Sequence, residues 1–167
     1  MKTPTIRFEE MTDDEFDVYL AATVVEYSEE GARATGMPMD EALEKGRAQL
    51  EELLPDGRHT EGQLIRKIVT DSGEILGRLW IAIQLEESPP RLFIYDIAID
   101  ESGRGRGVGS AAMLLLEEEA SRIGAEAIRL HVFTHNDGAV RLYTRLGYEV
   151  TFEGPGGMQM TKVLAIV

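Results

Sequence analysis

A short glycine-rich segment, placed between an apolar strand and a helix, contains the residues best suited to chemistry. Gly105, Gly107 and Gly109 alternate with other residues, and glycine lets the backbone turn sharply and approach a ligand closely. The amides of such a loop, with the free N–H groups and dipole of the following helix, suit an anion such as a pyrophosphate. The sequence therefore predicts an anion-binding loop made of Arg104, Gly105, Arg106, Gly107, Val108, Gly109 and Ser110.

A glycine-rich segment before a helix occurs in several kinds of phosphate-binding site and also in turns without a ligand. A Walker A loop is excluded because no Lys-Ser/Thr pair follows the glycines. A dinucleotide fingerprint is formally matched by Gly107-x-Gly109-x-x-Ala112, but Asp100–Arg106 separates this match from the preceding strand. In a dinucleotide site, the acidic residue that binds the ribose should lie at the end of the next strand. Here the acidic residue near that strand, Glu126, lies before its start. A glycine-rich turn without any ligand is the plainest alternative.

A coenzyme A loop is a further interpretation, and it comes from a resemblance to a known family. Arg104-x-x-Gly107-x-Gly109 resembles the Arg/Gln-x-x-Gly-x-Gly/Ala signature of the GNAT acetyltransferase superfamily. The surroundings of the motif fit this resemblance, because an apolar strand ends at Ile99 five residues earlier and a helix begins inside the motif.

A second block strengthens the resemblance to this family. Asn136-x-x-Ala139-x-x-Leu142-Tyr143-x-x-x-Gly147-Tyr148 is similar to a later family motif of strand, asparagine, helix, tyrosine, glycine and aromatic residue. The resemblance covers about Gln63 to Leu164. Within the superfamily, Phe93–Ile97, Leu130–Asn136 and the acidic N-terminal helices resemble a small bacterial subgroup that is little studied.

The resemblance implies where acetyl-coenzyme A lies. In this family the strand before the loop and the strand after its helix, here Leu92–Ile99 and Ile128–Phe133, are parallel and splay apart at one end. The pantetheine arm lies in this wedge and pairs with main-chain groups that here belong to Ile97, Ala98 and Ile99. The amide of Ile99 or Ala98 would stabilise the oxyanion. Asn136 matches the family's asparagine near the pantetheine.

The resemblance also assigns the general acid. Tyr143 matches the tyrosine whose hydroxyl sits beside the coenzyme sulfur, so we expect it to protonate the leaving thiolate. The alternative for Tyr143 is core packing, because it shares a helical stripe with Ala139, Leu142 and Leu146.

The general base stays open between several candidates. Several family members carry a glutamate on the strand where this chain has His131, and an imidazole suits proton acceptance near pH 7. Alternation places His131 on the same strand face as Arg129 and Phe133, and a structural histidine is its alternative role. Asp96 is the competing base, or else the partner of a backbone or arginine group. A relay of ordered water is a further alternative.

The predicted fold class is α+β, with a GNAT-like twisted, mixed and mostly antiparallel sheet of six or seven strands and about four helices. Alternating and apolar runs predict strands, and Leu92–Ile99, apolar on both faces apart from Asp96, predicts a central strand covered on both sides. A capping box at Thr12–Glu15 opens the first helix. The expected strands are Ile6–Phe8, Gln63–Thr70, Ile75–Ile83, Leu92–Ile99, Ile128–Phe133, Tyr148–Glu153 and Met158–Ile166, and the expected helices run from Thr12, from Asp40, over Val108–Ile123 and over Ala139–Leu146.

Composition excludes several other function classes. The 167 residues contain no cysteine, and the three histidines have no ligand spacing, so no metal is expected. The net charge is −13 and no basic cluster occurs, which argues against nucleic acid. No apolar stretch approaches the roughly 18 residues of a membrane span, and no signal peptide is evident, so a cytoplasmic protein is expected.

These observations predict direct acetyl transfer from acetyl-coenzyme A to a primary amine of a small molecule in a ternary complex. The acidic excess would solubilise the chain or attract a cationic amine. The alternatives are a protein N-terminal or lysine acetyltransferase and an inactive coenzyme-A-binding module. We expect one domain, 1–167, with acceptor-side helices at about 12–54 and a coenzyme A core at about 63–164. An edge strand at Met158–Ile166 could pair in a homodimer.

Overall fold

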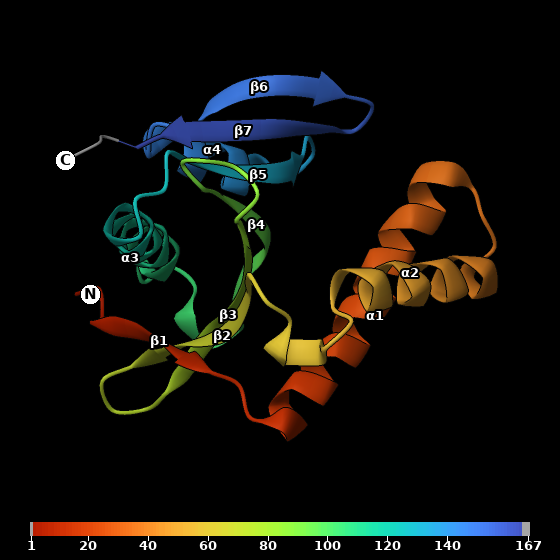
Figure 1. The fold of residues 1–167 in the computed structure, drawn as a ribbon, viewed down its shortest axis with the longest axis horizontal. Coiled ribbons are helices and arrows are strands. Elements are labelled where there is room, and N and C mark those ends of the chain that lie inside the picture. The colour runs from red at the N-terminus through yellow and green to blue at the C-terminus, as the bar shows by residue number, and fades with distance from the viewer. Residues whose placement is uncertain (1, 165–167) are drawn as a thin grey trace. The chain divides into compact units, whose positions relative to one another are not determined.

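The computed structural model describes residues 2–164, which form seven strands and four α-helices (Figure 1). The strands are β1 Ile6–Glu10, β2 Gln63–Thr70, β3 Ile75–Gln84, β4 Arg91–Ile99, β5 Ala127–Phe133, β6 Glu149–Gly154 and β7 Gly157–Val163. The helices are α1 Asp13–Thr35, α2 Met39–Leu53, α3 Val108–Arg122 and α4 Asp137–Arg145. The chain groups into two compact units, Met11–Gln63 and the combination of Met1–Glu10 with Leu64–Val167. The predicted GNAT-like α+β architecture is confirmed.

The unit Met11–Gln63 is a helical hairpin of α1 and α2. The predicted capping box is present, since Glu15 N donates to Thr12 Oγ1 at 3.2 Å and Thr12 N donates to Glu15 Oε1 at 2.9 Å. The helices approach closely at Gly46, where an added Cβ would lie 2.5 Å from Ser28 Oγ. Helix α1 continues through Gly31 and ends at Gly36, which adopts the left-handed conformation that favours glycine.

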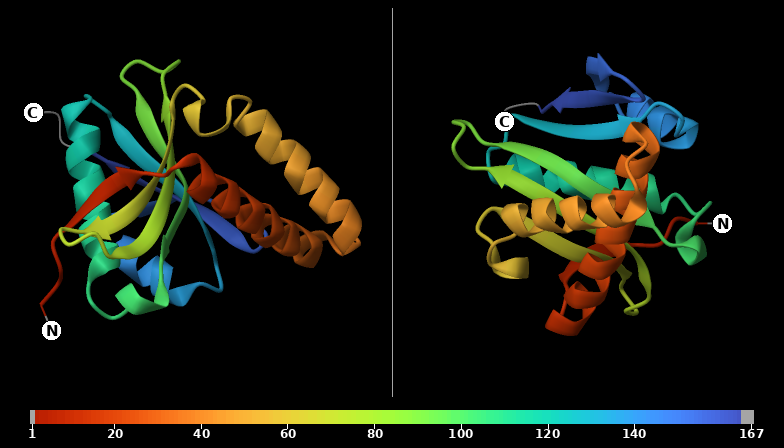
Figure 2. Two further views of the ribbon diagram at one scale, coloured as in Figure 1. Left: turned by 90° about the horizontal axis from the view of Figure 1, so that it is seen from below. Right: turned by 90° about the vertical axis from the view of Figure 1, so that its right-hand side faces the viewer.

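The second unit is built on one twisted seven-stranded sheet of order β1-β2-β3-β4-β5-β7-β6 (Figure 2). Strand β1 pairs with β2, β3 with β4, β5 with β7 and β6 with β7, all antiparallel. Strands β4 and β5 pair in parallel, as the family resemblance implied. Strand β7 lies between β5 and β6, so the expectation that Met158–Ile166 forms an edge is wrong. The edge strands of the sheet are β1 and β6, and β6 is the outer strand of the β6–β7 hairpin. Ala165 and Ile166 lie outside the described residues.

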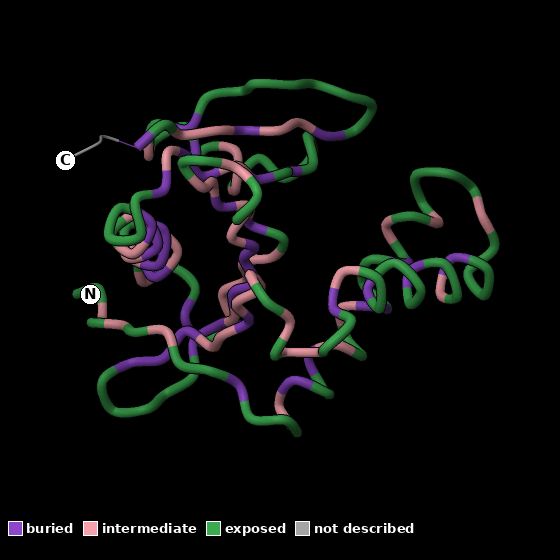
Figure 3. Tube along the Cα trace, in the orientation of Figure 1, coloured by how far each residue is buried: buried purple, intermediate pink, exposed green. Residues whose placement is uncertain are grey.

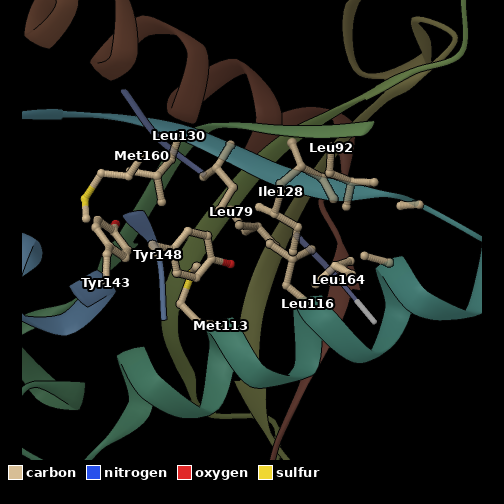
Figure 4. Packing of buried hydrophobic residues seen from close by; sticks show 14 of the residues in the cluster. Leu79, Leu92, Met113, Leu116, Ile128, Leu130, Tyr143, Tyr148, Met160 and Leu164 are labelled. Atoms are coloured by element: carbon tan, nitrogen blue, oxygen red, sulfur yellow. The ribbon is translucent and has the colours of Figure 1, made fainter. Parts of the chain in front are cut away.

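Helix α3 packs one face against the sheet, and Figure 3 shows its buried side turned that way. Met113 and Leu116 meet Leu79, Ile128 and Leu130 in the largest core cluster (Figure 4). We call this side the α3 face of the sheet. Alternation along the strands places Trp80, Arg129 and His131 on the opposite face.

Candidate functional site

The parallel pairing between β4 and β5 stops in the middle of the sheet. Paired residues run from Arg91 with Ala127 to Ile94 with Leu130, although both strands continue, to Ile99 and Phe133. The predicted splay is therefore present. Beyond Ile94, the side of β4 that faces β5 has no β5 partner within residues 2–164.

A β-bulge, which local sequence patterns do not indicate, marks the point where the splay begins. Trp80 pairs with Asp96, but the next residue of β3, Ile81, pairs with Ile94, so Tyr95 is an extra residue in β4. A bulge bends its strand and ends regular pairing, which gives a local cause for the splay. Tyr95 stacks on Trp80 with the ring centroids 4.7 Å apart and is 40% exposed. The prediction that this strand is covered on both faces is therefore wrong at Tyr95.

The glycine-rich loop follows directly from β4. Gly105 and Gly107 have φ of +73° and +76°, and Gly107 is the N-cap of α3. Ala111 N donates to Gly107 O at 3.1 Å as the first bond of the helix. The preceding amides, those of Val108, Gly109 and Ser110, therefore have no acceptor inside the helix and suit an anion.

The cationic side chains near the loop are held in different ways. Arg104 Nε donates to Ile99 O at 3.2 Å, which keeps this arginine beside the end of β4. Arg106 donates to Ser102 O at 3.1 Å and pairs with Glu74 at 3.2 Å, so part of its charge is compensated. Arg145 of α4 donates to Ser110 Oγ at 2.8 Å and brings a cation to the start of α3 that the sequence analysis missed.

Helix α4 places Tyr143 in the core. Asn136 caps this helix, its Oδ1 accepting from Ala139 N at 3.3 Å, which is a structural role for the predicted pantetheine neighbour. Tyr143 is 7% exposed and its ring lies 5.9 Å from that of Tyr148 (Figure 4). Burial, followed by the negative charge of Asp96, raises the pKa of Tyr143 to about 12, so the phenol keeps its proton at neutral pH.

The negative charge of Asp96 thus acts on Tyr143. Its carboxylate also accepts from Arg78 Nε at 3.2 Å, with Asp96 25% and Arg78 28% exposed. Asp96 therefore has an arginine partner, as one of the two alternatives for its role predicted. Arg78 could not be identified from sequence, because the pair depends on the register of β3 against β4.

His131 lies on the exposed side of β5, as the alternation predicted. Its ring meets Phe133 edge-on at 5.3 Å, and Phe133 stacks on His135 at 5.6 Å. On the neighbouring strand β7, the imidazole lies over Gly157. Since His131 follows the last residue of β5 that pairs with β4, its backbone stands where the splay begins.

Two further properties concern what the described residues lack. Within residues 2–164, no group of three or more His, Asp or Glu side chains is placed to hold a metal ion. No helix in the same part of the chain is long and apolar enough to cross a membrane.

Comparisons with known proteins agree with this geometry. The profile of the Acetyltransferase (GNAT) family matches residues 20–148. The chain is 34% identical to the uncharacterized N-acetyltransferase YdgE of Bacillus subtilis over 143 residues, which are 86% of this chain and 91% of YdgE. It is also 34% identical to the N-acetyltransferase YycN of the same organism over 88% of this chain and 94% of YycN.

Solved structures show the same fold. The crystal structure of YycN superposes with a TM-score of 0.83 and covers 90% of this chain and 96% of its own, at 31% identity. Spermidine N-acetyltransferase from Vibrio cholerae, solved with CoA and spermine, gives a TM-score of 0.66 at 14% identity and covers 95% of both chains. With the glycine loop, the splayed strands and the family profile in agreement, the chain belongs to the GNAT family of N-acetyltransferases.

Proposed function

We propose that the protein transfers an acetyl group from acetyl-coenzyme A directly to a primary amine of a small molecule, while both substrates are bound. The observation that carries this proposal is the interruption of the β4–β5 pairing beside the free amides at the start of α3. The interruption offers main-chain groups to an extended ligand, and the helix start offers donors to its phosphates.

The residues around the interruption fit acetyl-coenzyme A. Arg104 and the amides from Val108 to Ser110 would hold its pyrophosphate, and Ile97, Ala98 and Ile99 would pair with the pantetheine arm. A Cβ at Gly109 would lie 3.4 Å from Leu142 Cδ2 and 3.9 Å from Ile99 Cγ1, so this glycine keeps space between β4 and α4. When bound, the coenzyme supplies an acetyl group activated as a thioester.

The chain supplies groups for both proton transfers. The reaction forms a C–N bond and breaks a C–S bond. Starting from an ammonium, the nitrogen loses one proton before attack and a second as the amide forms, while the sulfur gains one, so that one proton is released to solvent overall. Tyr143, which holds its phenolic proton, is assigned as the donor to the sulfur. His131 is assigned as the acceptor from the ammonium, with Asp96 as its competitor. The amide of Ala98 or Ile99 would donate to the carbonyl oxygen as charge develops there.

The charge distribution supports a cationic acceptor. Residues 11–63 hold 14 acidic and 4 basic side chains, against 16 and 13 in the rest of the chain. An excess of negative charge attracts cations to its surroundings. The complex of the Vibrio cholerae relative with spermine shows that this fold can hold an amine of this kind. We therefore place amines with more than one positive charge among the first acceptors to test.

A free-thiol assay with acetyl-coenzyme A tests the proposal. Panels of diamines, polyamines, aminoglycosides and peptides should show turnover with small amines and initial-rate lines that intersect when both substrates are varied. Turnover with peptides alone would favour the protein acceptor. Tight coenzyme A binding without any turnover would favour the inactive module. Parallel lines and a mass increase of the protein by one acetyl group would contradict direct transfer.

The cytoplasmic location and the homodimer are also proposals. Beside β7 the edge strand is β6, whose six residues are all exposed, including Phe152 at 67%. Its register shift at Thr151 and its acidic Glu149 and Glu153 are features that discourage edge pairing. Sedimentation of the wild type and of Phe152→Asp tests a dimer through this edge, because the variant should shift the dimer to monomer.

A further inference from the structure

The first residue of β7 is a glycine whose backbone conformation does not require glycine. Gly157 has no positive φ, unlike Gly156 beside it at +75°. An alanine at position 157 would therefore be compatible with the backbone itself. The reason for glycine at this position must lie in the space that a side chain would occupy.

That space is filled by the imidazole of His131. A Cβ on Gly157 would lie 2.5 Å from His131 Nε2 and 2.7 Å from its Cε1, whereas the next nearest atom, Val132 O, is 3.4 Å away. Real Cβ contacts are not this short, so the imidazole can keep its place only because position 157 has no side chain.

The register shows in which direction the ring leans. His131 pairs directly with Gln159, and Gly157 is the partner of Phe133, two residues further along β5. The imidazole therefore leans toward the C-terminal end of β5, where β5 has separated from β4. Phe133 meets the ring edge-on at 5.3 Å with an interplanar angle of 86°, so the exposed imidazole lies against both Gly157 and Phe133.

We propose that Gly157 is a positioning residue for His131: its missing Cβ lets the imidazole lean toward the splayed ends of β4 and β5 instead of standing over Gln159. This inference rests on the proposed role of His131 as proton acceptor. With a methyl group at position 157, the imidazole has to rotate away, and the acceptor nitrogen moves with it. Because the colliding atoms belong to a side chain that can rotate, the fold should survive the substitution.

Gly157→Ala tests the inference, with Gly154→Ala as the matched control in the same hairpin. Gly154 also lacks a positive φ, and a Cβ there would meet only Phe152 Cε1 at 3.5 Å, an ordinary contact. The chain has three histidines, so the ring signals of His131 can be assigned in NMR spectra by their loss in His131→Gln. Gly157→Ala should shift these ring signals, and Gly154→Ala should leave them in place.

The kinetic test uses the same variants. Gly157→Ala should lower kcat/KM by roughly 10- to 100-fold, as expected for a misplaced group, and should change the acidic limb of the pH profile. In the His131→Gln background the substitution should have no further effect. Unchanged His131 signals, or an equal rate loss in that background, would overturn the inference.

Failure of the inference can be told apart from failure of the proposed base. If His131→Gln keeps the wild-type rate and pH profile, the base assignment is wrong, and Gly157 has no catalytic role whatever the NMR spectra show. If His131→Gln is slow but Gly157→Ala keeps the wild-type pH profile, only the positioning role is wrong. Should Gly157→Ala not fold, His131→Ala/Gly157→Ala removes the colliding ring and should be as stable as His131→Ala; a double variant that also fails to fold would overturn the contact.

Discussion

Tyr143 combines burial with a nearby negative charge, and both keep its phenol protonated. Tyr143→Phe removes the hydroxyl and keeps the ring that packs against Tyr148. If the phenol protonates the leaving sulfur, kcat should fall by about 10²- to 10⁴-fold, with little change in coenzyme A affinity. Steady-state kinetics and calorimetry measure the two effects.

The pH profile gives a second check on Tyr143. A pKa of about 12 means that the acid form persists well past pH 10, so Tyr143 should cause no alkaline loss of activity below that pH. An alkaline decline below pH 10 that disappears in Tyr143→Phe would contradict this. If Tyr143→Phe keeps the full kcat while chemistry is shown to be rate-limiting, Tyr143 only packs in the core and is not the general acid.

His131 and Asp96 make different predictions about the acidic limb. A neutral imidazole is needed for proton acceptance, so a histidine base predicts that kcat/KM falls at acidic pH. His131→Gln should remove this limb and lower the rate, while Asp96→Asn should leave the limb in place. A wild-type profile in His131→Gln would favour Asp96 or a water relay.

At this scale the sequence identified residue types better than their partners. Tyr143 and the exposed face of His131 followed from a motif and from alternation along a strand. The ion pair of Asp96 with Arg78 and the contact of Arg145 with Ser110 join residues 18 and 35 positions apart. Such contacts depend on strand register and on helix packing, which local sequence patterns do not contain.

At the scale of elements, the start of α3 has the clearest test. Gly107 is a poor position for a test substitution, because its φ is +76° and an added Cβ would lie 2.6 Å from Thr3 Oγ1. Gly109 has no such strain. Gly109→Val should fill the space between Ile99 and Leu142 and abolish calorimetric binding of coenzyme A.

Gly31→Val is the control for Gly109→Val. Gly31 is also helical and has nothing within 4 Å of an added Cβ, so it reports the cost of valine in a helix alone. Both variants should remain folded by circular dichroism. If folded Gly109→Val binds coenzyme A like the wild type, the assigned path of the ligand past α3 is wrong.

The contact between the end of α4 and the start of α3 leads to another prediction. Arg145→Ala removes a cation from the helix start and should weaken coenzyme A binding by roughly two- to fivefold, the range for an exposed charge. Because salt screens such charges, the difference should shrink as ionic strength rises. Calorimetry at low and high salt measures it.

Arg122→Ala is matched to Arg145→Ala, since Arg122 is also an exposed arginine in the last turn of a helix, where it pairs with Glu118 at 2.6 Å. It should leave coenzyme A affinity unchanged. Equal weakening in the two variants would mean that only net charge matters, and it would remove the specific role of Arg145.

Element boundaries were predicted closely because they depend on local signals. The capping box at Thr12 and the glycines after the helices are read directly from the chain, and β2 was predicted with its observed bounds. The bulge at Tyr95 and the interior place of β7 were missed. A bulge leaves apolar alternation almost unchanged over a short strand, and strand order is decided by packing of the whole sheet.

At the scale of the whole molecule, the net charge of −13 either serves solubility alone or also attracts the acceptor. Electrostatic attraction acts over about 10 Å at 0.1 M salt and raises association rates by roughly 10- to 10³-fold. The attraction grows with the charge of the ligand. A diamine and a monoamine of similar length should therefore respond differently to salt.

Raising the ionic strength from about 0.01 to 0.5 M should lower kcat/KM for the diamine by roughly tenfold or more, and much less for the monoamine, because a shorter Debye length screens the double charge more strongly. The kcat at saturation should stay nearly constant for both, since screening acts on the encounter. Measurements in chloride and acetate salts at equal ionic strength separate screening from competition by one anion at the coenzyme A loop, as does a saturating concentration of acetyl-coenzyme A. Equal salt dependence for the two amines would show that the acidic excess does not guide the acceptor, and the negative charge would then be a matter of solubility.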